Sequence, residues 1–133
     1  MASLKSFIKL AEYCHQLNSP IDFIIIYIKE AHASDGLKFI GPQYSFIATH
    51  QDIQDRLDAA KILIEMAKIN KENKISVYCD TIDNHTNILF RASPERLYVL
   101  YDQKVLYQGQ NGPFGYSIPS LEFFLKNNVL LHK

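Results

Sequence analysis

The chain has 133 residues and a mass of 15.3 kDa, and 47% of its residues are hydrophobic. A chain of this size buries about two thirds of its extended surface on folding, so the composition predicts one globular domain rather than a disordered protein. The 14 basic and 14 acidic side chains give a formal net charge of +0, and no basic cluster stands out, so we expect no nucleic-acid partner.

The first two predicted elements are a helix and a buried strand. From about residue 3 to residue 18, apolar side chains recur every three or four positions, which indicates one buried face of a helix. Residues 21–28 then form a predicted strand. Because Phe23–Ile28 is apolar at every position instead of alternating, we expect a central strand that helices cover on both faces.

A long irregular segment precedes the second predicted helix. Residues 29–50 contain turn signals such as Asp35–Gly36, and long loops in compact domains are commonly functional. Thr49, followed three residues later by Asp52, resembles a capping box at the start of a helix. The apolar face of that helix continues to about Ile69.

The second half of the chain predicts shorter elements that end in a hairpin and a helix. They are a strand at 75–79, a short helix or turn at 83–90, strands at 97–100 and 104–108, and a helix after Ser117. Asp102–Gln103 predicts a two-residue turn between the last two strands. The order of elements is that of an α/β sandwich. Because its opening helix has no strand to cross from, we expect a first strand to be missing.

Five segments, in the order in which they occur, carry a resemblance to a known family. They are YIKEAHASDG at 27–36, HQDIQDRLDAA at 50–60, DT at 80–81, PERLYVL at 94–100 and GQNGPFGY at 109–116. Together they resemble the iodothyronine deiodinases, which are thioredoxin-fold selenoenzymes. The resemblance covers essentially the whole chain. It implies a single domain at 1–133 with a thioredoxin-like (peroxiredoxin-like) fold, in which helices flank a mixed sheet that lacks its first strand.

The resemblance implies reductive removal of iodine from thyroxine or related iodothyronines. In the family a selenocysteine attacks the iodine and a thiol reductant, as co-substrate, regenerates the selenolate; no bound cofactor is implied. The selenocysteine precedes a helix that MASLKSF at 1–7 matches, so we expect the nucleophile upstream of Met1. A UGA codon read as a stop would account for this, and real loss of the segment is the alternative. Homodimerisation and membrane attachment through an N-terminal segment are implied by the family alone.

Tyr27, Glu30 and His32 follow the end of the predicted central strand, where α/β sheets place their ligands. By resemblance they are catalytic. Once iodine leaves as a positive equivalent, the ring carbon needs a proton, and a chain of these three groups is suited to deliver it. The residues alone favour a structural interpretation, with a core tyrosine, a solvated glutamate and a histidine bonded to a loop carbonyl; the resemblance reverses that preference.

Two further residues are substrate-binding by resemblance. His50 is expected to bond the hydroxyl or carboxylate of the iodothyronine, although a histidine beside a helix start is also a common capping neighbour. Arg96 is expected to hold the substrate carboxylate, which a guanidinium can bind through two parallel hydrogen bonds. The alternative for Arg96 is a surface ion pair with an acidic side chain.

The two cysteines do not replace the expected nucleophile. Cys14 lies on the apolar face of the first helix and Cys79 in a strand, where a thiol has little thiolate character. Their spacing favours a reduced compartment and indicates neither a disulfide framework nor a metal site.

With no long apolar run and no signal peptide, we expect a soluble, intracellular chain. The alternatives to a deiodinase are an inactive thioredoxin-like binding module and a peroxiredoxin-like thiol enzyme.

Overall fold

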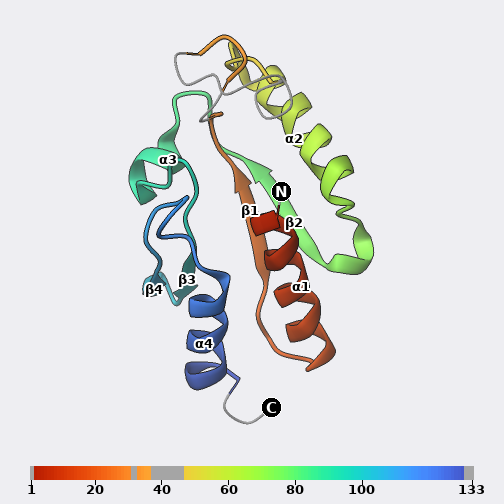
Figure 1. Cartoon of the computed structure of the whole chain (residues 1–133), viewed down its shortest axis with the longest axis vertical. Coiled ribbons are helices and arrows are strands. Elements are labelled where there is room, and N and C mark those ends of the chain that lie inside the picture. The colour runs from red at the N-terminus through yellow and green to blue at the C-terminus, as the bar shows by residue number, and fades with distance from the viewer. Residues whose placement is uncertain (1, 31–32, 37–46, 131–133) are drawn as a thin grey trace.

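Helices and two pairs of strands alternate along the chain (Figure 1). The computed structural model describes residues 2–30, 33–36 and 47–130. Its elements are α1 (Ala2–Gln16), β1 (Phe23–Tyr27), α2 (Ile53–Ala67), the 3₁₀ turn η1 (Lys71–Asn73), β2 (Ile75–Cys79), α3 (His85–Phe90), β3 (Tyr98–Tyr101), β4 (Lys104–Gln108) and α4 (Ile118–Asn128). The predicted α/β class is confirmed.

Local signals at the element ends explain most of these boundaries. Asn18 has a φ of 54° and ends the first helical segment in the left-handed conformation. Ser117 caps α4 by accepting a hydrogen bond from the Ser120 N–H at 3.2 Å. Asp102 and Gln103, with φ values of 50° and 62°, form the expected tight turn between β3 and β4.

The predicted capping box at the start of α2 is wrong. Asp52 alone is the cap, because its carboxylate accepts the Asp55 N–H at 2.9 Å. Thr49 lies outside the helix and instead donates its N–H and its hydroxyl to the Asp35 carboxylate, at 2.7 and 2.9 Å. The pattern identified the right place but assigned the cap three residues too early.

The described strands form two separate pairs, whereas the resemblance implies one mixed sheet that lacks its first strand. β1 is parallel to β2, in register from Phe23 with Ile75 to Tyr27 with Cys79, and β3 is antiparallel to β4. The two pairs meet through side chains of a shared core, not through backbone hydrogen bonds, and Phe23 and Leu97 both belong to that core. Each strand therefore has one unpaired edge within the described residues.

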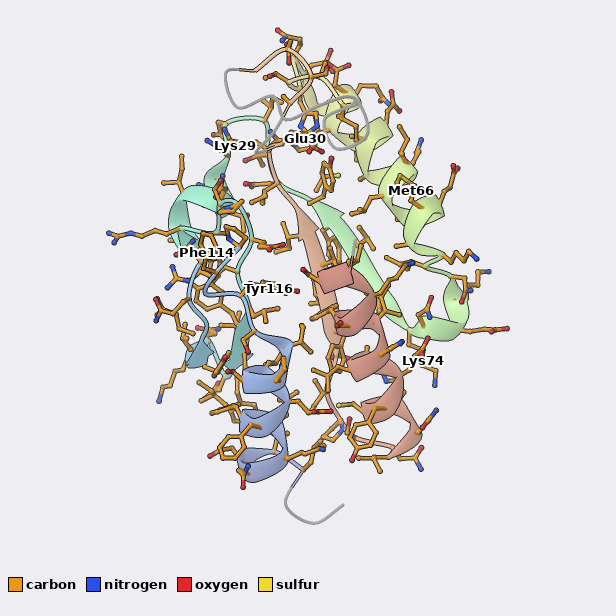
Figure 2. All side chains as sticks on the ribbon, in the orientation of Figure 1. Lys29, Glu30, Met66, Lys74, Phe114 and Tyr116 are labelled. Carbon is orange, nitrogen blue, oxygen red and sulfur yellow. The ribbon has the colours of Figure 1, made fainter. Side chains whose placement is uncertain are left out.

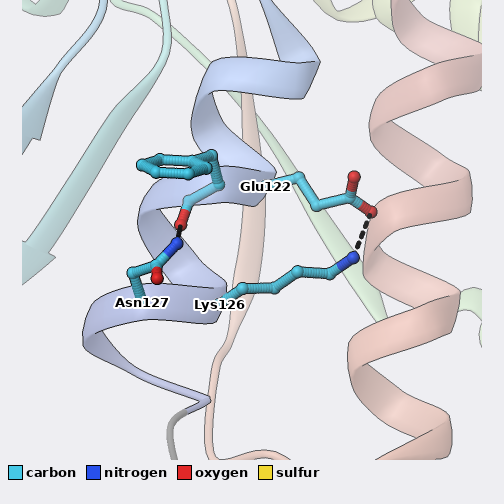
Figure 3. A network of polar contacts seen from close by, with 4 residues as sticks. Glu122, Lys126 and Asn127 are labelled. Carbon is cyan, nitrogen blue, oxygen red and sulfur yellow. Dashed lines mark hydrogen bonds and ion pairs between the residues drawn. The ribbon is translucent and has the colours of Figure 1, made fainter.

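The core lies where α1 and α4 pack together beside β1. Leu10, Ala11 and Cys14 of α1 and Leu121 and Leu125 of α4 are buried. The predicted buried face of α4 is confirmed at Leu121 and Leu125. Figure 3 shows polar contacts along the same helix: Lys126 lies 3.9 Å from Glu122, and the Asn127 side chain donates to the carbonyl of Phe123 at 2.7 Å.

The expectation that helices cover both faces of the first strand is wrong. Phe23 is 5% exposed, but Ile24 and Ile26 are 51% and 42% exposed. Alternate residues of a strand point to opposite faces, so α1 and α4 bury the side of Phe23 and leave the side of Ile24 and Ile26 half covered. An apolar run reports hydrophobicity at every position, but it does not report which neighbours cover it.

The unpaired edges predict aggregation of the 133-residue chain expressed alone, because an unpaired strand of apolar residues is a template for another chain. The double substitution Ile24→Lys/Ile26→Lys should shift the chain from aggregates toward monomer in size-exclusion chromatography with light scattering. The matched control is Ile88→Lys/Leu89→Lys, which adds the same charge at exposed positions of α3. A soluble unmodified monomer with a cooperative melt would contradict the prediction.

Candidate functional site

The end of β1 brings together two of the predicted catalytic residues and one predicted substrate-binding residue. Tyr27 closes the strand and its hydroxyl donates to the Glu30 carboxylate. The His50 ring lies 5.7 Å from the Tyr27 ring, tilted by 38°. Figure 2 shows Glu30 at the end of the molecule where β1 ends, near the start of α2. His32 lies outside the described residues, so the structure places three of the five predicted site residues in one cluster.

His50 is buried and has one ring nitrogen engaged. Its side chain is 9% exposed, and Nδ1 accepts a hydrogen bond from Nε of Arg56 at 2.9 Å. The other nitrogen, Nε2, is buried without a hydrogen-bond partner among the described residues. Burial lowers the pKa of His50, and the positive charge of Arg56 lowers it further, while Asp55 opposes them. Both burial and Arg56 therefore favour the neutral imidazole.

Arg56, which the sequence analysis did not single out, connects this cluster to the end of β2. Its guanidinium is 2% exposed and donates through Nη1 to the Thr81 and Asp80 carbonyls, at 2.6 and 3.5 Å, and through Nη2 to the Asn84 side chain at 3.0 Å. The available signal was its position within HQDIQDR, six residues after His50 and one turn into the helix. An arginine among polar neighbours is ordinarily read as a solvated residue.

Asp80 fixes the ends of both parallel strands. Its carboxylate, 1% exposed, accepts three backbone hydrogen bonds, from Thr81, Thr86 and Asn87, each at 2.8 Å. Its own N–H donates to the Tyr27 carbonyl at 2.9 Å. Burial raises the pKa of Asp80, but the hydrogen bonds from Asn87, Thr86 and Thr81 outweigh burial and hold that pKa below its ordinary value. The end of β1, the end of β2 and the start of α3 are thereby tied together.

Comparison with known proteins identifies the family of this chain. The family model for iodothyronine deiodinase matches residues 1–129. The chain belongs to the iodothyronine deiodinase family. The relationship was expected from the segments around Tyr27, His50 and Arg96, and it is confirmed over nearly the whole length.

Individual deiodinases cover the chain at similar levels of identity. It is 42% identical over 125 residues to thyroxine 5-deiodinase of Gallus gallus, which covers 94% of this chain and 45% of that protein. It is 41% identical over 102 residues to type I iodothyronine deiodinase of Xenopus laevis, 77% of this chain and 38% of that protein. Type II iodothyronine deiodinase of Homo sapiens is 35% identical over 129 residues, which is 96% of this chain and 45% of that protein. The chain spans less than half the length of these deiodinases.

Arg96 is held apart from the cluster at the end of β1. Its Nε donates to the Gly109 carbonyl at 2.7 Å and its Nη1 to the Phe90 and Arg91 carbonyls at 3.3 and 3.4 Å, while the guanidinium lies 5.3 Å from the centre of the Tyr98 ring. In the described part of this deiodinase-family chain, we find neither an ion pair of Arg96 nor a contact with Tyr27, Glu30 or His50. The role of Arg96 stays a prediction.

Neither cysteine of this deiodinase-family chain is poised as a nucleophile. Cys14 is fully buried in the core, and burial, followed by the charge of Glu122, raises the pKa of its thiol. Burial also raises the pKa of Cys79, whose sulfur lies 3.8 Å from the Arg56 carbonyl oxygen. Over the described ranges, no His, Cys, Asp and Glu side chains group as a metal site would require, and no helix combines the length and apolarity of a membrane span.

Replacing the buried carboxylate tests the structural role of Asp80. In the Ile24→Lys/Ile26→Lys background, Asp80→Asn should lower the free energy of unfolding by about 2–3 kcal/mol, because an amide cannot accept all three N–H groups. Urea unfolding measures this change. Asp102→Asn, at an exposed turn position, is the control and should shift it by less than about 0.5 kcal/mol.

The same substitution should change the acid limb of the stability profile. Because the folded pKa of Asp80 is lowered, its contribution is present above the unfolded pKa of about 3.9 and is lost as the pH falls through the folded pKa. The parent should therefore lose stability below about pH 4 more steeply than Asp80→Asn. Parallel acid limbs for the two proteins would contradict the assigned role.

Proposed function

We propose that this chain is the catalytic domain of an iodothyronine deiodinase, acting on thyroxine or a related iodothyronine with a selenocysteine supplied by a segment that precedes residue 1. The observation that carries the proposal is the cluster of Tyr27, Glu30 and His50 at the end of β1, in a member of this family. Relatives named thyroxine 5-deiodinase support the substrate class.

The chemistry balances with a selenolate, a proton and two thiols. The selenolate takes iodine from the ring carbon, so the C–I bond breaks, an Se–I bond forms, and the electron pair left on carbon accepts a proton. Two thiols then reduce the selenenyl iodide, which gives the selenolate, iodide, a disulfide and two protons. The thiol reductant is thus a co-substrate and no bound cofactor is required. Cys14 and Cys79 lack the thiolate character that this attack needs.

The residues of the cluster suit the protonation step. The Tyr27 hydroxyl and the Glu30 carboxylate share a hydrogen bond and are both partly buried, so a proton can pass between them. His32 is the third member of this proposed relay. His50 offers Nε2–H to an oxygen of the substrate, since that nitrogen has no partner within the described ranges.

Arg96 is proposed to hold the substrate carboxylate from the other side of the site. Its Nε and Nη1 bind backbone carbonyls, so within the described residues Nη2 is the nitrogen left to meet a carboxylate. A bidentate grip would need one of those carbonyl contacts to be exchanged. Of the predicted site residues, Arg96 is thus the one whose proposed role requires its side chain to give up a hydrogen bond that it makes in this structure.

The proposed fold of the whole domain is thioredoxin-like. Within the described residues, β1 and β3 each pair along one edge only, and their neighbouring residues Phe23 and Leu97 share the core. One further strand between β1 and β3 would join the two pairs into a single mixed sheet and satisfy both edges. It would also bring the proposed selenocysteine, between that strand and α1, to the sheet that carries Tyr27.

The decisive test extends the chain upstream to include the selenocysteine segment. With thyroxine and a dithiol, the selenocysteine protein should release iodide, and a version with alanine at that position should release it only at the background rate. Reading the codons before Met1 provides the independent check for an in-frame UGA. Equal iodide release by the two proteins would reject the enzymatic reading, and iodothyronine binding without turnover would then favour a binding module.

The proton relay has its own prediction in the extended protein. Glu30→Gln and Tyr27→Phe should each lower kcat by about 10²–10⁴-fold with a smaller change in KM, because general acid catalysis acts in the transition state. Glu65→Gln, an exposed glutamate on α2, is the matched control. If kcat stayed unchanged in Glu30→Gln and Tyr27→Phe, the relay would be excluded while the family function stood.

A further inference from the structure

Arg56 has a geometry that fixes the state of the histidine beside it. A guanidinium has five N–H donors and no acceptor, so the 2.9 Å contact between its Nε and Nδ1 of His50 has only one direction. Nδ1 must accept, and a neutral imidazole that accepts at Nδ1 carries its proton on Nε2. The contact therefore selects one of the two neutral tautomers.

Arg56 is itself immobilised on the side away from His50. The Thr81 and Asp80 carbonyls and the Asn84 side chain accept from its Nη1 and Nη2, and the guanidinium is 2% exposed. These acceptors follow β2, whose end Asp80 ties to the start of α3. The orientation of the His50 ring is thus set by backbone beyond β2, not by α2 alone.

Within the part of the chain that the structure describes, the selected tautomer leaves a buried donor without an acceptor. His50 is 9% exposed, and Nε2 has no hydrogen-bond partner among the described residues. An unsatisfied buried polar group costs about 1–3 kcal/mol, so such a group in a functional cluster calls for a ligand atom as its acceptor. The oxygens of an iodothyronine, phenolic or carboxylate, are acceptors of the right kind.

We propose that Arg56 is a positioning residue that holds His50 as the neutral Nε2–H tautomer and so presents a hydrogen-bond donor to an oxygen of the bound iodothyronine. The ligand part of this inference rests on the proposed function; the tautomer part does not. His50 accordingly acts as a fixed neutral donor, and neither as a general base through Nε2 nor as an imidazolium.

The charged and titratable groups around His50 support a neutral ring. Asp55 and Arg56 face it from α2, Tyr27 faces it from the end of β1 with Glu30 hydrogen-bonded behind it, and Asp80 lies beyond Arg56 after β2. Arg56 is in direct contact with the ring, and its Nε–H occupies the site that a second proton would need. Protonation of His50 would break this contact and place two cations together.

Nitrogen-15 NMR tests the tautomer directly in the ligand-free protein. The extended protein with alanine in place of selenocysteine is labelled at histidine, and His50→Gln identifies the signals. From about pH 6 to about pH 8, Nδ1 of His50 should resonate as an unprotonated nitrogen and Nε2 as a protonated one. A protonated Nδ1, or titration of His50 near its ordinary pKa of about 6.5, would overturn the proposal.

Variants separate positioning from general stability. Arg56→Gln should give mixed tautomers and raise the pKa of His50, and Arg56→Lys, which has a single nitrogen, should restore the wild-type spectrum only in part. Asn84→Gly removes one tether of Arg56 while keeping a backbone that favours the observed φ of 62°. Asn84→Gly should therefore change the tautomer ratio and the pKa of His50 less than Arg56→Gln does. It replaces Arg56→Gln as the test if that variant does not fold. Arg91→Gln, at an exposed position, is the control.

Binding of defined analogues tests the ligand part. Arg56→Gln should weaken thyroxine binding by about 5–20-fold, which is the loss of roughly one hydrogen bond. This effect should vanish for the analogue that lacks the oxygen bound by Nε2–H, either the one without the phenolic hydroxyl or the one without the carboxylate. A loss that persists with both analogues would overturn the assignment. If no form binds any iodothyronine, the proposed function fails and the NMR result still decides the tautomer.

Discussion

The buried carboxylate of Asp80 is the constraint on which the site depends. Three backbone N–H groups satisfy it, and its own N–H holds the Tyr27 carbonyl, so the ends of β1 and β2 and the start of α3 occupy fixed relative positions. A carboxylate that is 1% exposed persists only when its hydrogen bonds are complete. Those hydrogen bonds offset the cost of burying the carboxylate, and the N–H of Asp80 fixes where Tyr27 ends its strand.

A second buried group extends this order to the ligand side of the cluster. The carbonyls of Asp80 and Thr81 accept hydrogen bonds from the guanidinium of Arg56 and so fix its position. The guanidinium in turn donates to the ring of His50 and orients it. Tyr27 and Glu30 are placed by β1, while His50 is placed by this network. The cluster therefore combines a strand end held by backbone hydrogen bonds with a proposed donor, the Nε2–H of His50, whose proton position follows from the contact with Arg56.

Local patterns predicted the elements well and non-local relations poorly. The strands at 75–79 and 104–108 and the cap at Ser117 depend on neighbouring residues, which a sequence displays directly. The division into two strand pairs and the exposure of Ile24 and Ile26 depend on what packs beside β1, which no local pattern contains. The same limit applies to Arg56, because the acceptors of its Nη1 and Nη2 lie 24 to 28 positions further along the chain.

For the site, the resemblance supplied the residues and the structure supplied their relations. Tyr27, Glu30 and His50 come together as a family assignment would suggest, whereas Arg96 is committed to carbonyls near β3 and β4. The residue types alone gave no reason to separate Arg96 from the others. A substrate that bound both His50 and Arg96, as proposed, would have to reach from the end of β1 to the segment before β3.

In the proposed mode of binding, an iodothyronine lies at the end of β1 with one of its oxygens on His50. A crystal structure of the extended protein, with alanine replacing selenocysteine and thyroxine bound, is the direct test. We expect a phenolic or carboxylate oxygen within hydrogen-bond distance of Nε2 of His50 and the ligand next to Tyr27. Thyroxine bound elsewhere, with Nε2 of His50 still without a partner, would contradict it.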